Sequence, residues 1–498
     1  MFRSALVILV VCVTAFVILV APNILKANYV WLMQLSFVIG CLFAIVKRKE
    51  DFLVFLFIVS LSFVALNINM ARYLPEIGYL VPWVASSDLV FIVMVSIEVV
   101  RIWTRKANLR FPMAGNKGFL ILIGSLIFSY LVIAPKYSSY QSAGFFSLFC
   151  VIKGYLVFLY FYNYFRSVEK FKVVLVSFAF VILVQFGFMM YQWISGDFMT
   201  IVGFVYESVE ETPIEKYGIA RKAFGTFNYP SVAAGVVMII YPVAIAFANL
   251  REASSKALGI STYLILILSP LCILLSGMRI GLIGLFIMTP LILYLISYRY
   301  KIKYGKTSLY IPTLMALIGV VALVVSPVAE HWRGRFSYED LVENSLAFRL
   351  LMPKIGARAL EKNPVLGVGW GNGDKYATTL LKAGEEDLYT VGLHNGYVAM
   401  LVENGVIGLI SYIIWYISLL LASTRRDKNC NQGTQFAFLG GVTVVILVQM
   451  LLVDTQGIFL RAPAEYLYFC VCLGFFRGYD EIKEKRSTIF IKELRSGY

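Results

Sequence analysis

The chain has 498 residues, of which 60% are hydrophobic and only 15% are charged. This composition excludes an ordinary soluble globular protein, and the apolar runs of span length predict a polytopic, all-α membrane protein. The formal net charge of +15 does not indicate nucleic-acid binding, because the basic residues gather in short loops between apolar segments, where they set membrane topology.

Apolar segments of roughly 20 residues predict about 14 membrane-spanning helices, with a range of about 12–14. In chain order they lie at residues 4–22, 29–46, 52–71, 79–100, 118–134, 145–162, 172–194, 229–249, 261–277, 280–298, 308–326, 395–421, 436–453 and 463–476. No small-residue cleavage site follows the first segment, so we expect a retained helix there and not a secretory signal.

The basic residues predict the topology. If the N-terminus is cytoplasmic, every predicted inside loop carries lysine or arginine, so we expect both termini in the cytoplasm. The expected organisation is N-terminal membrane helices, an outer loop, further membrane helices, a large outer loop, C-terminal membrane helices and a cytoplasmic tail, at residues 1–194, 195–228, 229–326, 327–394, 395–476 and 477–498. The cysteines lie within spans or in an inside loop, and no Cys/His group has metal spacing, so we expect no external disulfide and no metal site.

The large outer loop is too long to be a simple turn, and we expect it to be ordered and functional. Apolar residues at near-helical spacing over 344–363, among them Leu350 and Ile355, predict an amphipathic helix on the membrane surface. Pro353 is expected to kink or interrupt it. The Gly-rich run at residues 367–373 lacks the strand–turn–helix context of a nucleotide site, and instead predicts a tight turn that brings the loop back toward His394.

Basic side chains are expected at particular points on the outer side. Arg221 and Lys222 precede a re-entry into the membrane, Arg279 lies in a hairpin between two spans, and Arg349 lies on the loop helix. Guanidinium groups match phosphate oxygens bidentately, and several together favour binding of a diphosphate. Contact with lipid headgroups for Arg279, and pairing with Glu343 for Arg349, are the structural alternatives.

His394 is one of only two histidines and lies at the mouth of the span at 395–421. Asn395 is the expected N-cap of this helix. A neutral imidazole here accepts a proton from a hydroxyl, a protonated one steadies a phosphate, and a structural hydrogen bond is the alternative. Glu403 is expected on the opposite helix face, where it does not orient His394 directly, and Gly405 with its neighbour Gly408 predicts close helix packing.

Lys153 is the unusual charged residue inside a predicted span. Because an unpaired ammonium is costly in the membrane, it either pairs internally or lines a cavity, or it extends toward the outer surface. Both interpretations remain open at the level of sequence.

Four motifs follow one another on the expected outer side. They are RKAFGTFNYP at 221–230, SGMRIG at 276–281, NPVLGVGWGN at 363–372 and HNGYVAMLVENGVIG at 394–408. Together they resemble the O-antigen ligase and O-antigen polymerase family of the bacterial envelope, over about residues 221–421. The chain departs from the usual motif at Met278, where serine is common, and around Pro230.

The resemblance implies a GT-C-like, metal-independent inverting glycosyltransferase without a cofactor. Such an enzyme moves a glycan from undecaprenyl diphosphate to a hydroxyl of a glycan or lipid A–core acceptor, at the periplasmic face of the inner membrane. His394 would be the base or position the donor, and Arg279 and Arg349 would hold the diphosphate. The expected substrate-binding residues are Arg221, Lys222, Asn395 and Lys153.

A transporter or flippase, and a transferase that acts on proteins, are the alternative functions. A transporter or flippase typically has charged groups near the midplane and internal repeats, whereas the polar residues here gather on the outer side, which favours the enzyme. Transfer of an oligosaccharide to a protein hydroxyl is chemically the same reaction and stays open. The predicted number of spans favours a polysaccharide polymerase over a ligase, and the expected partners are lipids and glycans, not nucleic acid.

Overall fold

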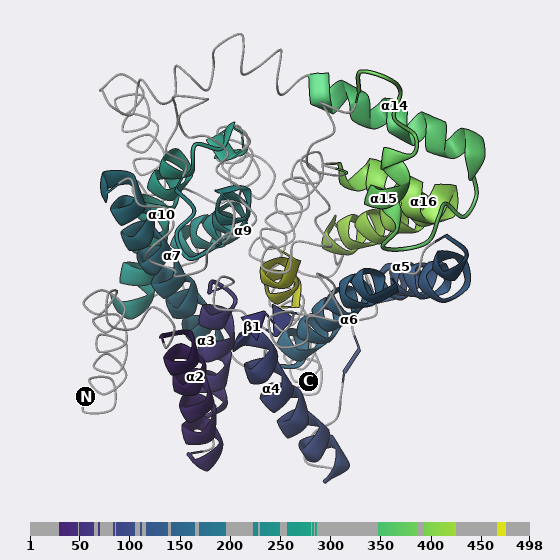
Figure 1. Ribbon diagram of the computed structural model, residues 1–498. Helices are drawn as coiled ribbons and strands as arrows, with labels where there is room; N and C mark the ends of the chain where they lie inside the picture. The colour runs from purple at the N-terminus through teal and green to yellow at the C-terminus, as the bar shows by residue number, and fades with distance from the viewer. Residues whose placement is uncertain are drawn as a thin grey trace, which may run out of the picture.

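The protein is helical throughout most of the part that the computed structural model describes (Figure 1). The described residues are 29–47, 49–63, 68–69, 83–84, 86–104, 110–111, 116–137, 141–164, 169–195, 223–227, 230–249, 256–279, 281–282, 284–285, 347–385, 393, 395–424 and 466–474. The helices are α2 (Tyr29–Val46), α3 (Glu50–Ser60), α4 (Ser86–Trp103), α5 (Asn116–Phe128), α6 (Gln141–Tyr164), α7 (Glu169–Ser195), α9 (Pro230–Asn249), α10 (Lys256–Ser276), α14 (Ala347–Lys362), α15 (Gly373–Thr378) and α16 (Gly396–Thr424).

Several predicted spans coincide with long apolar helices. Among the described residues, four helices are long and apolar enough to cross a membrane, at Asn116–Lys136, Lys172–Ile194, Leu258–Ser276 and Gly396–Leu421. They match the predictions at 118–134, 172–194, 261–277 and 395–421, and the shorter apolar helix Pro230–Ile245 lies within the prediction at 229–249. The predicted spans at 4–22, 308–326 and 436–453 lie outside the described residues. The total of about 14 spans therefore stays a prediction.

The segment between α3 and α4 differs from the prediction. We expected spans at 52–71 and 79–100, but α3 ends at Ser60 and α4 begins at Ser86. Within this interval β1 (Ile68–Asn69) pairs antiparallel with β2 (Trp83–Val84). Pro82 directly precedes β2 and disfavours a helix that runs into α4, while Ile, Trp and Val suit an extended backbone.

Aromatic packing forms the centre of the helical bundle. The Phe119 ring of α5 lies 5.2 Å from the ring of Trp415 in α16 and 5.9 Å from that of Phe158 in α6. The helical segment 466–474 lies inside the same core, with Tyr466 fully buried beside Trp415. In Figure 1 this segment, drawn in yellow, lies between the early helices and α16. Burial of these large rings fixes the position of α16, the helix that follows His394.

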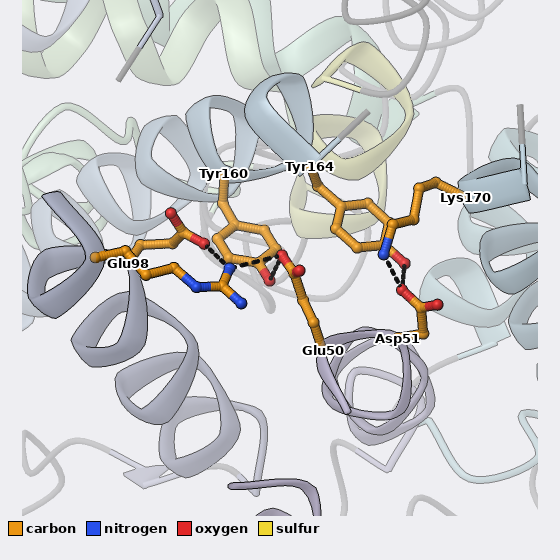
Figure 2. A network of polar contacts seen from close by, with 7 residues as sticks. Glu50, Asp51, Glu98, Tyr160, Tyr164 and Lys170 are labelled. Carbon is orange, nitrogen blue, oxygen red and sulfur yellow. Dashed lines mark hydrogen bonds and ion pairs between the residues drawn. The ribbon is translucent and has the colours of Figure 1, made fainter. Parts of the chain in front are cut away.

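A network of charged and aromatic side chains joins α3, α4, α6 and α7 (Figure 2). It consists of Glu50, Asp51, Glu98, Arg101, Tyr160, Tyr164 and Lys170. Arg101 bridges the carboxylates of Glu98 and Glu50 at 2.6 and 3.2 Å, and Tyr164 donates to Asp51, which also pairs with Lys170. Arg101 and Lys170 belong to predicted inside loops, so two of the residues that were used to predict topology also link helices.

Helix α16 is broken at Gly405, which has φ 61° and ψ −161°. We expected this glycine to permit close helix packing, and that interpretation missed the break. The backbone amides beyond the break find partners in the large loop: Val406 donates to the Pro364 carbonyl at 3.0 Å, and Ile407 donates to the Val365 carbonyl at 3.3 Å. These bonds satisfy amides that lack partners within the second part of the helix.

The carbonyls before the break are also paired with the loop. The Val368 amide donates to the Val402 carbonyl at 3.1 Å, and the Gly369 amide donates to the Glu403 carbonyl at 2.7 Å. The loop thus passes along the break and pairs with backbone groups on both sides of it. Non-helical backbone at the membrane is stable only where protein or water satisfies its polar groups, and here the loop does so.

Helix α14 packs against the first part of α16, and its course corrects one expectation. The helix continues through Pro353, which therefore does not interrupt it. Leu350 is 57% exposed and does not belong to the buried face. The buried residues of α14 form a cluster with residues of α16: Leu351, Met352, Ile355 and Ala359 with Val398, Ala399 and Val402. The apolar stripe of α14 is therefore covered by protein.

An ion pair fixes the end of the described loop to α14. The guanidinium of Arg358 donates to both carboxylate oxygens of Glu385, at 2.5 and 2.8 Å, and to the Leu380 carbonyl at 2.8 Å. Glu385 also accepts the amide of Lys382 at 2.8 Å. These hydrogen bonds lower the pKa of Glu385 from 4.5 to about 2. The turn at residues 380–385 is thus held to the helix by charge-assisted hydrogen bonds.

Replacement of the glycine at the helix break tests this architecture. In Gly405→Ala the new Cβ lies 2.4 Å from the Val365 carbonyl carbon, and the left-handed backbone alone costs about 1–3 kcal/mol. We expect a lower midpoint of thermal unfolding for the purified protein. Gly124→Ala, on α5, is the matched control because its Cβ meets nothing within 4 Å. Equal midpoints for the two variants would contradict the break.

The Arg358–Glu385 pair predicts a specific pH dependence. Since the pKa of Glu385 is lower in the folded protein than its ordinary value of 4.5, the pair stabilises the protein above pH 4.5, and this contribution is lost as the pH falls toward 2. We expect the unfolding midpoint of Glu385→Gln to lie below that of wild type at pH 6, and the difference to shrink at pH 3. A difference that is constant between these pH values would refute the assignment.

Candidate active site

The structure describes three of the predicted site residues completely and one in part. Arg279, Asn395 and Lys153 are described, and Arg349 lies in the first turn of α14, where only the backbone is described. Arg221, Lys222 and His394 lie outside the described residues. The residues next to them in the chain are described, however, and their contacts form two clusters that include described residues from each of the four sequence motifs.

The first cluster holds the segment 223–227, which follows Arg221 and Lys222. Gln192 of α7 is fully buried and binds the backbone of this segment. Its carbonyl oxygen accepts the amides of Phe224 and Gly225 at 3.0 and 2.8 Å, and its NH₂ group donates to the Gly225 carbonyl at 3.1 Å. One side chain thus satisfies three backbone groups of a non-helical segment.

Gln185 lies seven residues earlier on α7 and acts in the same way on Thr226. Its carbonyl oxygen accepts the Thr226 amide at 2.9 Å, and its NH₂ group bonds to the Thr226 hydroxyl. The hydroxyl in turn donates to the Ser62 carbonyl after α3. Gly225 has φ 63°, and a Cβ there would lie 2.0 Å from the Gln185 side-chain oxygen. Only glycine fits this turn without displacing the glutamine.

The segment 223–227 is joined directly to the hairpin that carries Arg279. The Ala223 amide donates to the carbonyl of Leu275 at 3.1 Å, at the end of α10. The chain then turns through Gly277, at φ 63°, and the Ser276 hydroxyl accepts the Met278 amide at 3.3 Å. Arg279, which is partly exposed, follows at once. The backbone hydrogen bond between Ala223 and Leu275 therefore links the segment that follows Lys222 to the hairpin of Arg279.

The second cluster forms around the Gly-rich run and Glu403. The Glu403 side chain is fully buried, and its two carboxylate oxygens accept the amides of Gly371 and Gly373 at 3.1 and 3.0 Å. A Cβ at Gly373 would lie 2.5 Å from a carboxylate oxygen. The expectation that Glu403 does not orient His394 directly is consistent with these contacts, because the carboxylate holds the loop.

The Gly-rich run leads to the segment around His394. Asp374 follows the run, and its carboxylate accepts the amide of Leu393 at 2.7 Å. On the other side of His394, the Asn395 side chain accepts the amides of Tyr397 and Val398, both at 3.0 Å. The predicted N-cap is therefore confirmed, and the loop returns to the residue that precedes His394. Backbone amides at a helix start favour a bound anion.

The same loop is anchored to the end of α5. There the helix passes into a π-helical turn, Ser129–Ile133, and a 3₁₀ turn, Ala134–Lys136. The Ser129 hydroxyl accepts the Trp370 amide at 3.0 Å, and the Asn372 side chain donates to the Ala134 carbonyl at 3.1 Å. Trp370 is almost fully buried. The Gly-rich run is thus fixed on two sides, by α16 and by the end of α5.

Lys153 of α6 is buried and forms an ion pair with Asp88 of α4. Its ammonium nitrogen also lies 5.9 Å from the centre of the Phe91 ring. The sequence left open whether Lys153 pairs internally or extends toward the outer surface. In the structure it pairs internally. Its assignment to substrate binding stays a prediction.

Sequence reasoning missed four residues that organise the site: Gln185, Gln192, Asp374 and Glu403. The two glutamines carried a signal, because polar side chains seven residues apart in an apolar span share a face and mark a polar function there. Glu403 carried one too, as a carboxylate inside an apolar span, although the sequence does not show its partners. Asp374 gave none, since its partner is a backbone amide of another segment. No group of three metal-binding side chains occurs within the described part of the chain.

Chemically, the second cluster places two anion-favouring features on one rigid support. Arg349 lies on α14, whose buried face packs on the first part of α16, and the capped start of α16 directly follows His394. In Figure 1, α14, α15 and α16 form one group, and α7, α9 and α10 form another. Arg279 follows α10 and Arg349 lies on α14, so these two basic residues belong to different groups of packed helices.

Residues 264–413 match the model of a protein family described as O-antigen ligase. This stretch contains Arg279, Arg349, His394 and the break in α16. A protein of Haemophilus influenzae (strain ATCC 51907 / DSM 11121 / KW20 / Rd), described as an uncharacterized protein, is 24% identical over 257 residues. The match covers 49% of this chain and 62% of that relative, less than two thirds of the relative's length.

The motifs at Arg279, in the Gly-rich run and around Asn395 thus fall within the matched residues and within the clusters described above. Residues 264–413 are thus similar to the family described as O-antigen ligase, and the similarity is limited to this part of the chain.

Proposed function

We propose that the protein is an inverting glycosyltransferase that moves a glycan from a polyprenyl diphosphate, such as undecaprenyl diphosphate, to an acceptor hydroxyl at the outer face of the inner membrane. The acceptor is the end of a second glycan chain or a lipid A–core sugar. The reaction requires neither a metal nor a cofactor in this proposal. Its organisation is that expected from the sequence, with the active site in the periplasm and both termini in the cytoplasm.

The observation that carries the proposal is the second cluster. The amides of Leu393 and of the first turn of α16 are held by Asp374 and Asn395, on either side of His394. The helix of Arg349 packs on the same part of α16. A candidate base and a candidate phosphate ligand therefore belong to segments that one rigid unit supports, as catalysis by positioning requires.

In the proposed reaction, the acceptor oxygen attacks the anomeric carbon of the donor while the bond from that carbon to the diphosphate oxygen breaks. His394 accepts the hydroxyl proton, and the polyprenyl diphosphate leaves with the bonding electrons. Arg279 and Arg349 stabilise the charge that grows on the leaving diphosphate, with Arg221 or Lys222 as a further cation. Asn395 holds the start of α16, and Asn395 and Lys153 are proposed to bind the substrate.

Loss of the proposed catalytic groups is expected to reduce transfer strongly. In membranes from complemented cells, we expect His394→Ala to lower the initial rate of glycan transfer by about 10²–10⁴-fold, the usual contribution of a general base. Arg279→Ala and Arg349→Ala are each expected to lower it by about 10²–10³-fold. Lys362→Ala is the matched control. Lys362 is exposed, and its replacement removes one positive charge from the same helix as Arg349. Full activity of a folded and inserted His394→Ala protein would refute the proposed base.

The glycan profile of cells that lack the protein distinguishes the possible acceptors. Long polymer that remains on the polyprenyl carrier indicates a ligase, whereas acceptors that carry a single repeat indicate a polymerase. Unglycosylated proteins with normal surface polysaccharide indicate transfer to protein hydroxyls. A normal profile of all three products would contradict the proposed function.

A further inference from the structure

The Glu403 side chain, which lies next to the break in α16, binds a part of the loop that the backbone bonds at the break do not reach. The backbone groups on both sides of Gly405 are already paired with residues 364–369 through four backbone hydrogen bonds. The Glu403 side chain binds farther along the loop, at the amides of Gly371 and Gly373. A buried polar side chain in a membrane helix is costly unless it is hydrogen-bonded, and the amides of Gly371 and Gly373 provide such bonds to Glu403.

The bonds of Glu403 extend to the start of its own helix. Gly373 begins α15, and the next residue, Asp374, accepts the amide of Leu393. Leu393 and Asn395 enclose His394 in the chain. The positions from 395 to 403 span about 12 Å along a helix, which is about two turns. The loop is bonded to Glu403 at one end of this stretch and to the amide of Leu393, just before its other end.

We propose that Glu403 and Asp374 are positioning residues for His394. Glu403 holds the Gly-rich run against the break, and Asp374, carried by that run, holds the amide of Leu393. Together with the cap by Asn395, this fixes the backbone on both sides of the histidine relative to α14 and Arg349. This inference rests on the proposed function for its catalytic consequence, while its structural content is measurable without activity.

Asp374 offers the cleaner test of the two. Its side chain is exposed, and a single hydrogen bond of an exposed residue contributes little to stability, so its loss leaves the protein folded. Asp374→Ala removes the acceptor for the Leu393 amide, whereas Asp374→Asn keeps an equivalent oxygen. The two variants therefore separate the hydrogen bond from the negative charge. Glu403→Gln keeps one acceptor oxygen but presents an NH₂ group to the other amide, and forms a second, independent perturbation.

The chain allows a direct spectroscopic measurement because it contains two histidines. In a His331→Gln background, His394 is the single source of imidazole signals in a ¹⁵N-histidine NMR spectrum of the purified full-length protein in detergent. We expect Asp374→Ala and Glu403→Gln to shift these signals and Asp374→Asn to restore them. Glu385→Ala, which breaks the Arg358 pair in the same loop, is the matched control and is expected to leave them in place.

Kinetics on the same proteins give the second readout. We expect Asp374→Ala to lower kcat by about 10–100-fold with an unchanged KM for the donor, because a displaced catalytic group affects the reaction more than donor binding. Asp374→Asn should recover most of kcat. Unchanged His394 signals in folded Asp374→Ala would overturn the proposal even if Glu403→Gln fails to fold. Shifted signals with unchanged kcat would also overturn it, whereas a wild-type protein without transfer activity contradicts the proposed function alone.

Discussion

The pairing of the backbone around Gly405 is the constraint on which the rest of the site depends. An apolar helix that breaks near the membrane frees amides and carbonyls that must be satisfied within the protein. Residues 364–369 satisfy them in α16, and this forces the loop to lie along the helix. The glycines of the loop follow from this approach, since a Cβ at Gly367 would lie 2.5 Å from the Glu403 carbonyl carbon. The π-helical end of α5 and the packing of α14 complete the same assembly.

In the first cluster, side chains and not a loop provide the partners for the free backbone groups. There the non-helical segment 223–227 receives its partners from Gln185 and Gln192 of α7. In both clusters, rigid helices support short irregular segments, and Arg221, Lys222 and Arg279 adjoin those of the first cluster in the chain. This arrangement allows flexible arginine and lysine side chains to act from fixed backbone positions, which reduces the entropy lost when they bind a phosphate.

Sequence reasoning predicted the helices well where apolar periodicity and capping determine them. The spans at 172–194 and 395–421, the Asn395 cap and the return of the Gly-rich run toward His394 all follow from local signals. The break at Gly405 was missed because glycine is common in membrane helices and was interpreted as a packing residue. The polar stretch Glu403-Asn404-Gly405 does interrupt the apolar run there, and Asn-Gly is a turn signal. The spacing of apolar residues predicted α14 as an amphipathic helix, but only the position of α16 determines which of its residues are buried in the protein. The roles of Glu403 and Asp374 depend on contacts across the fold that no local pattern encodes.

The proposed transferase cleaves a polyprenyl diphosphate donor. This is tested by measuring the products of a single turnover by purified protein in lipid nanodiscs, with a synthetic polyprenyl-diphosphate glycan, an acceptor glycan and excess EDTA. We expect one released polyprenyl diphosphate for each new glycosidic bond, with inverted anomeric configuration. An intact donor that is only bound, or that crosses the bilayer in vesicles without loss of its glycan, would refute the proposed transfer and indicate a transporter.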